Sequence, residues 1–128
     1  MTYLDTSVAL AHLLAEDQRP PEGLWAEELV TSRLLEYELW TRLQARGLAG
    51  SHGDAARLLL ARVAFLELLP RTLERALDPF PLPVRTLDAL HLASMSFLRE
   101  HGEEVVLATY DRRLAACAES MGMGLREV

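Results

Sequence analysis

The chain has 128 residues, half of them hydrophobic and a quarter charged, which is the composition of an ordinary globular domain. Its formal net charge of -6 argues against broad attraction to phosphate backbones, so binding of nucleic acid would need local basic patches or bound cations. All 13 basic residues are arginine, and the lack of lysine excludes phosphate-binding loops, protein-kinase chemistry and Schiff-base catalysis.

The cysteine count and the hydropathy pattern exclude an internal disulfide and a membrane-spanning helix. Cys117 is the only cysteine, so no internal disulfide can form, and we expect it in the core. No apolar run approaches the roughly 20 residues of a membrane-spanning helix, and no basic flank precedes an apolar stretch near the N-terminus. We therefore expect one domain over residues 1–128, located in the cytoplasm and not associated with a membrane.

Apolar periodicity predicts short strands that alternate with helices. In chain order, the pattern predicts a strand at 2–4, a helix at 5–14, a short helix at 24–29, a strand at 29–32, helices at 34–45 and 51–63, a strand at 65–69, helices at 71–77 and 85–100, a strand at 105–109, a helix at 112–121 and a last strand at 124–128. Thr6 or Ser7 is placed to cap the first helix, and Ser51 with Asp54 marks the start of the third. Gly102 lies just past the long helix.

This alternation predicts an α/β fold of three layers, in which a mostly parallel central sheet lies between helices. Ligands of such sheets bind outside the carboxyl ends of the strands. Asp5 follows the first predicted strand, and Asp111 follows the strand in LATYD. Two carboxylates should therefore meet at one edge of the sheet.

Two more acids lie on largely apolar helix faces. Glu38 falls between Leu34 and Leu35 on a helical wheel, whereas Glu36 points elsewhere. Asp88 lies near the start of the long helix, among leucines. Acidic residues of an ordinary solvent-exposed helix face are seldom flanked by so many apolar side chains.

Each of these acids also has a purely structural interpretation. Asp5 and Asp111 would act as helix N-caps. Glu38 would pair with Arg42 one turn later, and Asp88 with the arginine three residues before it, as modest surface ion pairs.

Four carboxylates gathered within about 5 Å would repel by about 3 kcal/mol per pair at an effective dielectric constant of 20. Either protons or divalent cations must then neutralise them. An all-oxygen site of this kind suits Mg²⁺ or Mn²⁺. His91, three residues after Asp88, has the spacing of a metal ligand, but a packed or hydrogen-bonded histidine is the preferred interpretation.

The segments YLDTSVAL, TSRLLEYEL, RTLDALHLA and LATYDRRL resemble the four signature segments of PIN-domain ribonucleases, and more narrowly those of the VapC toxins of bacterial and archaeal toxin–antitoxin pairs. The resemblance runs from Tyr3 to the C-terminus with the segments in the family's order. It implies a PIN-like fold, an endoribonuclease that depends on Mg²⁺ or Mn²⁺, an RNA substrate, a cognate antitoxin and a homodimer.

The resemblance also implies which residues form the site. The metal-binding acids would be Asp5, Glu38, Asp88 and Asp111. Glu36 is a rival of Glu38 in register, and the family spacing from Ser32 favours Glu38. The supporting hydroxyls would be Thr6 or Ser7, together with Thr109. The candidate phosphate contacts are Arg85, Arg112 and Arg113, for which solvated helix termini are an equal alternative.

Other functions compete with this one. A catalytically inactive PIN-like module would bind RNA or a protein without cleaving it. A phosphoryl-transfer or signalling domain also places an acid after its first strand, but the absence of lysine argues against it. Trp25, Tyr37 and Trp40 are candidate aromatic contacts of the homodimer, with core packing as the alternative for each.

Overall fold

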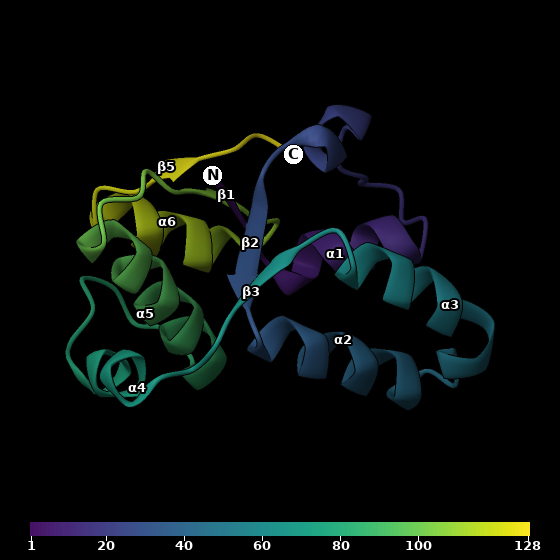
Figure 1. Ribbon diagram of the computed structural model, residues 1–128, viewed down its shortest axis with the longest axis horizontal. Helices are drawn as coiled ribbons and strands as arrows, with labels where there is room; N and C mark the ends of the chain where they lie inside the picture. The colour runs from purple at the N-terminus through teal and green to yellow at the C-terminus, as the bar shows by residue number, and fades with distance from the viewer.

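The computed structural model describes residues 1–128, and its strands form one sheet with helices on both sides (Figure 1). In chain order, the elements are β1 (Thr2–Leu4), α1 (Thr6–Leu13), the 3₁₀ helix η1 (Glu22–Ala26), β2 (Leu29–Ser32), α2 (Leu34–Ala45), α3 (Ala49–Leu60), β3 (Ala64–Leu66), α4 (Pro70–Leu77), α5 (Thr86–Glu100), β4 (Val106–Ala108), α6 (Arg112–Ser120) and β5 (Gly124–Leu125). None of the helices is both long enough and apolar enough to cross a membrane.

The sheet has five strands in the order β3-β2-β1-β4-β5, and every neighbouring pair is parallel. The first strand of the chain is therefore the central one, and Tyr3 is in register with Val30 on one side and Leu107 on the other. The predicted α/β class and its three layers are confirmed, and the sheet is wholly parallel. All its strands consequently end at the same edge.

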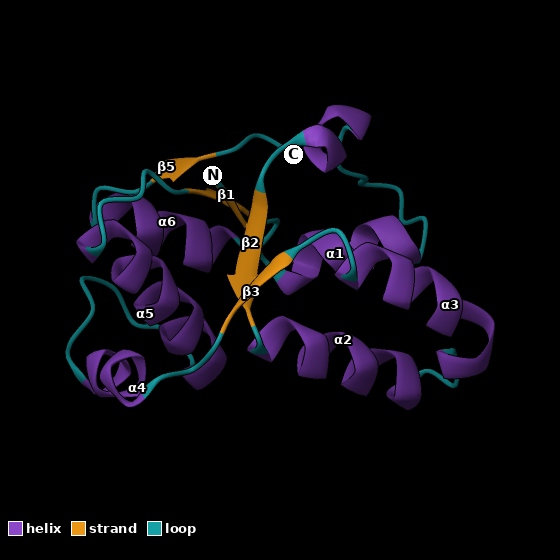
Figure 2. Ribbon diagram, viewed as in Figure 1, coloured by secondary structure: helices purple, strands orange, loops and turns teal.

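Helices lie on both sides of the strands (Figure 2). Alternate residues of the strands belong to two separate hydrophobic clusters, one on each face of the sheet. Leu4 and Leu29 belong to the cluster formed with α1, α2 and α3. Tyr3, Val30 and Leu107 belong to the cluster formed with α5 and α6. Helix α4 packs against the outer side of α5. Cys117 is fully buried in the second cluster, as predicted.

Several predicted boundaries differ from the observed ones. Helix α3 begins at Ala49, two residues before Ser51, with Leu48 in the N-cap position and no side-chain cap. Strand β3 ends at Leu66, because its last ladder bond goes from the Arg33 N–H to the Leu66 carbonyl and the chain then leads into Pro70. The helix expected at 24–29 is a 3₁₀ turn that ends before β2.

The three aromatic residues expected at a dimer interface have different environments. Trp25 is only 9% exposed and packs in the first cluster, so the interface prediction is wrong for it. Trp40 is partly buried beneath Arg57, whose guanidinium carbon lies 5.1 Å from the ring centroid. Tyr37 is 67% exposed and is the one of the three whose side chain is open to a partner.

Candidate acidic site at the carboxyl edge of the sheet

Asp5 stands where the central strand becomes a helix. Its backbone N–H donates to the Ala108 carbonyl at 3.0 Å, which joins the end of β1 to the end of β4. Its side chain is the N-cap of α1, which confirms the structural interpretation of Asp5, and the prediction that Thr6 or Ser7 caps this helix is wrong. The carboxylate is buried, which would be costly without hydrogen-bond donors.

Three donors converge on one oxygen of that carboxylate. The Oδ2 atom accepts hydrogen bonds from the Ser7 hydroxyl at 2.6 Å, the Thr109 hydroxyl at 2.8 Å and the Ser7 N–H at 3.3 Å. The Ser7 and Thr109 hydroxyls therefore have the supporting place predicted for them. The Thr6 hydroxyl is buried and has no hydrogen-bond partner, so it does not orient the acid.

The same two hydroxyls hold the loop that follows β4. Ser7 Oγ accepts from the Tyr110 N–H at 3.0 Å, and Thr109 Oγ1 accepts from the Asp111 N–H at 2.9 Å. Asp111 in turn caps α6, because its Oδ1 accepts from the N–H groups of Arg113 at 2.9 Å and Leu114 at 3.2 Å. The backbone at Asp111 is thus tied to Asp5 through one threonine.

Asp88 lies in the first turn of α5, and the negative charges of Asp5 and Asp111 act on its carboxyl group. Partial burial raises the pKa of Asp88 above its ordinary value, and the negative charges of Asp111 and Asp5 raise it further. No ion pair joins Asp88 to Arg85, so the structural interpretation of this acid fails. The structure therefore brings three aspartates from three separate segments into electrostatic contact.

Glu38, on α2, is hydrogen-bonded to a histidine of α5. Its Oε1 atom lies 2.6 Å from His91 Nε2, and its side chain is 14% exposed. His91 is fully buried between Glu38 and Tyr3, whose hydroxyl lies 2.7 Å from Nδ1. His91 is thus the hydrogen-bonded histidine that the sequence favoured, and Glu38 contacts it in place of Arg42.

Glu36, the rival in register, points away from this region. It pairs with Arg33 at 2.9 Å, and both side chains are 37% exposed. Arg33 also binds Glu67 at 2.8 Å and stacks on Phe65. These contacts place Glu36 in a surface ion-pair network and leave Glu38 as the acid that faces α5.

Three of the four acids share one feature: a single oxygen holds the side chain in place. The protein hydrogen bonds of Asp5 fall on Oδ2, those of Asp111 on Oδ1 and that of Glu38 on Oε1. The second oxygen of each accepts no hydrogen bond from the protein. This is the arrangement of an anchored ligand with a free donor atom, and carboxylate oxygens are what Mg²⁺ or Mn²⁺ binds.

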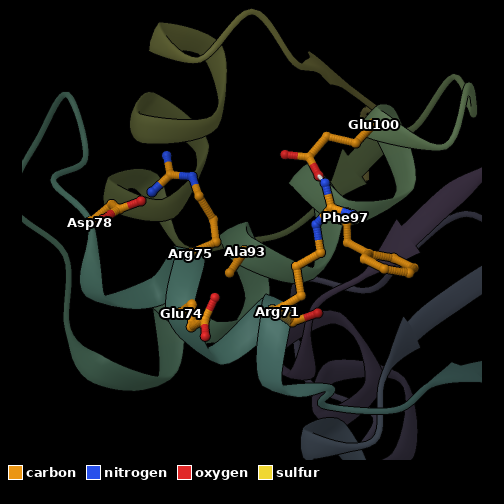
Figure 3. Close-up of a pocket in the computed structure, with 8 residues that line it drawn as sticks. Arg71, Glu74, Arg75, Asp78, Ala93, Phe97 and Glu100 are labelled. Atoms are coloured by element: carbon orange, nitrogen blue, oxygen red, sulfur yellow. Dashed lines mark ion pairs between the residues drawn. The ribbon is translucent and has the colours of Figure 1, made fainter.

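The acids fit such an ion by donor type and charge, although no three His, Cys, Asp or Glu side chains already surround a common point. The cavity drawn in Figure 3, of about 320 Å³, lies between α4 and α5 and contains none of the four acids. Arg71 and Glu100 form an ion pair across it at 3.5 Å.

Comparison with known proteins shows which family the chain belongs to. The family model described as PIN domain matches residues 2–120. The chain belongs to the PIN-domain family. Among curated relatives of this PIN domain, ribonuclease VapC47 of Mycobacterium tuberculosis is 30% identical over 95% of the chain and 93% of its own length. Ribonuclease VapC35 of the same species is 28% identical over 98% and 95%.

Solved structures give the same fold for this PIN domain. VapC20 of Mycobacterium tuberculosis, described as a toxin that cleaves the sarcin–ricin loop, superposes with a TM-score of 0.65 at 23% identity, over 91% of this chain and 94% of its own. A toxin–antitoxin complex from Klebsiella pneumoniae contains a chain with a TM-score of 0.61 at 16% identity, over 90% and 91%. The PIN-like fold implied by the four sequence segments is confirmed.

We expect Asp88→Asn to raise the melting temperature of the metal-free protein by about 1–3 °C at pH 7. A raised pKa means that the folded state holds this proton more tightly than the unfolded chain does, so the ionised carboxylate lowers the free energy of unfolding as the pH rises above 3.8. The effect is small because water partly screens the half-buried group.

Thermal unfolding followed by circular dichroism in EDTA tests this expectation. The gain should vanish below pH 3.8, where both states carry the proton. Asp17→Asn, at an exposed acid outside the site, is the matched control and should leave the melting temperature unchanged. A lower melting temperature for Asp88→Asn at pH 7 would contradict the argument.

Proposed function

We propose that this chain is a metal-dependent endoribonuclease that hydrolyses RNA phosphodiester bonds and acts as the toxin of a VapC-type toxin–antitoxin pair. The observation that carries the proposal is the set of four acids, three of which are anchored through one oxygen and keep the other free of protein hydrogen bonds. Two relatives that match nearly the whole chain are named ribonucleases. Such an enzyme would meet RNA in the cytoplasm.

Asp5, Asp88 and Asp111 would hold the metal, with Glu38 as the fourth acid. When bound, one or two Mg²⁺ or Mn²⁺ ions would activate a water and stabilise charge on the scissile phosphate and on the leaving 3′ oxygen. The chain's own contribution is orientation: Ser7 and Thr109 fix the plane of the Asp5 carboxylate, and the first turn of α6 fixes that of Asp111.

Arginine side chains beside the acids are suited to the RNA backbone. Arg112 and Arg113 are exposed at the start of α6, next to Asp111, and both line a cavity of about 520 Å³ with Leu82 and Pro83. Arg85 is exposed just before α5, three residues from Asp88. We propose that these guanidinium groups contact phosphates, since a chain of net charge -6 needs local cations to bind RNA.

RNA cleavage is the direct test. We expect purified protein loaded with Mg²⁺ or Mn²⁺ to cut total cellular RNA, and Asp5→Asn to cut it about 100-fold more slowly or worse, since losing a metal ligand costs at least as much as losing a residue that supports one. EDTA should stop cleavage. Glu36→Gln is the matched control and should keep full activity because Glu36 lies in a surface ion pair.

Two outcomes would overturn this proposal. If the loaded wild type cuts no RNA that Asp5→Asn leaves intact, the chain is not a metal-dependent ribonuclease. If it binds RNA tightly without cutting it, and EDTA does not alter that binding, the chain is instead a catalytically inactive binding module.

Metal affinity tests the site without any substrate. In calorimetric titrations with Mn²⁺, we expect Asp5→Asn, Asp88→Asn and Asp111→Asn each to weaken binding by at least about 10-fold, and Glu36→Gln to bind like the wild type. Asparagine keeps an oxygen for the helix caps at positions 5 and 111, so these variants should fold. Equal affinity in all of them would show that these acids do not bind the metal and that Asp5 and Asp111 are only helix caps.

We propose two protein partners: a cognate antitoxin, and a second copy of the chain. The Klebsiella pneumoniae chain of similar fold comes from a toxin–antitoxin complex. For the homodimer, Tyr37 offers an exposed aromatic ring on α2, beside a cavity of about 450 Å³ that Trp40 and Gln44 also line. Interfaces are enriched in such aromatic residues.

Light scattering at micromolar concentration should give twice the 14.3 kDa of one chain, and Tyr37→Ser should shift the protein toward the monomer because it removes the exposed ring. Tyr37 is exposed, and all the hydrogen bonds that hold Asp5, Glu38 and Asp111 come from other residues, so the variant should still bind Mn²⁺. A single-chain mass for the wild type would exclude the homodimer.

A further inference from the structure

A buried hydrogen-bond relay connects the central strand to Glu38. Tyr3, in β1, contacts His91 Nδ1 through its hydroxyl at 2.7 Å, and His91 Nε2 contacts Glu38 Oε1 at 2.6 Å. Residues 3 and 91 are both at most 1% exposed, and the Glu38 side chain is 14% exposed. Three side chains from β1, α5 and α2 therefore form one continuous path that ends at Glu38.

The acidic end of this relay fixes the direction of its hydrogen bonds. The Glu38 carboxylate can only accept, so His91 donates to it from Nε2. In a neutral ring Nδ1 then carries no proton and accepts from the Tyr3 hydroxyl. The Tyr3 Oη atom accepts from the Ser32 N–H at 3.0 Å, which agrees with this direction.

This direction of the hydrogen bonds, with His91 as the donor to Glu38, suits an acid that binds a cation. A neutral N–H donor holds Glu38 Oε1 without adding the positive charge that an arginine or lysine partner would bring. The other oxygen, Oε2, accepts no hydrogen bond from the protein. The carboxylate is thus held through one oxygen, and its other oxygen is left for a ligand.

Both ring nitrogens of His91 are occupied, so the ring has no lone pair left for a metal ion while the relay is intact. The ring is also packed edge-on against Tyr3, with centroids 5.7 Å apart and an angle of 80° between the planes. Asp88 precedes His91 by three residues on the same helix, so α5 presents one acid directly and orients a second one through His91.

We propose that His91 is a positioning residue, held by Tyr3 with its proton on Nε2, which orients the Glu38 carboxylate toward the metal ion of the proposed ribonuclease site. The metal half of this inference rests on the proposed function. The relay itself is a property of the folded chain and is testable without metal, RNA or activity.

The first measurement is the tautomer. Long-range ¹H–¹⁵N spectra of the metal-free protein at neutral pH should show, for His91, a protonated Nε2 and an unprotonated Nδ1. The double variant Tyr3→Phe/Glu38→Gln removes the hydroxyl donor and the charged acceptor together, and it should abolish this fixed preference. A wild-type ring that carries its proton on Nδ1, or one that exchanges between both forms, would overturn the relay.

The second measurement is a double-mutant cycle on Mn²⁺ affinity by calorimetry. His91→Leu removes the donor and should weaken binding by about 10-fold, a typical cost of losing a group that orients a metal ligand. His91→Gln places an amide N–H near the position of Nε2 and should recover most of the affinity. In a Glu38→Gln background, His91→Leu should add nothing, because it acts only through Glu38.

The possible outcomes distinguish the positioning role of His91 from the proposed function of the chain. If His91→Leu weakens binding equally with and without Glu38, the histidine is merely structural and the positioning role is overturned. If the wild type binds Mn²⁺ but Glu38→Gln and His91→Leu bind it as tightly, only the positioning role fails. If the wild type binds no Mn²⁺, the proposed function fails and the positioning role with it, while the tautomer still decides the relay.

Discussion

The Oδ2 atom of Asp5 joins three segments of the chain, and the arrangement of the acidic site depends on it. Ser7 donates to it from α1, and Thr109 donates to it from beyond β4. A hydrogen bond to a charged group is worth about 1.5–3 kcal/mol net, so these donors offset much of the cost of burying the carboxylate. Thr109 also accepts from the Asp111 N–H, which sets the position of the second acid relative to the first.

The edge of the sheet explains why these acids meet. Strands β1 and β4 are neighbours and run parallel, so their carboxyl ends lie side by side, and an acid placed after each strand arrives at the same place. Helix α5 adds Asp88 across the edge, where burial and the two neighbouring charges raise its pKa. The site is consequently a place where like charges oppose folding, which is common where selection acts on function and not on stability.

Some residues of the site were predictable because their signals are local. Asp5 and Asp111 follow directly after buried strands, and Glu38 lies on an apolar helix face at the family spacing from Ser32. The choice between Glu38 and Glu36 became firm only with the contacts of each, since an ion pair with Arg33 occupies Glu36. Tyr3 was missed as a partner because nothing local distinguishes it from any other aromatic residue of a buried strand.

Two predictions, the cap of α1 and the exposure of Trp25, were wrong because the local sequence does not show which contacts the folded chain makes. Thr6 and Ser7 are equally good caps by composition, yet Asp5 takes the cap and Ser7 supports it, while the Thr6 hydroxyl is buried without a partner. Trp25 was predicted as an interface aromatic, but the fold buries it in the first cluster.

The sequence alone determined the order of strands and helices, the parallel sheet and the family, because periodicity, turn residues and short motifs are properties of neighbouring residues; from the same motifs it predicted the four acids. Only the tertiary structure decided which oxygen of each acid is anchored, which glutamate faces α5 and how His91 links Tyr3 to Glu38. These features depend on contacts across 53 and 88 positions of the chain, and such contacts exist only once the sheet and its helices have packed.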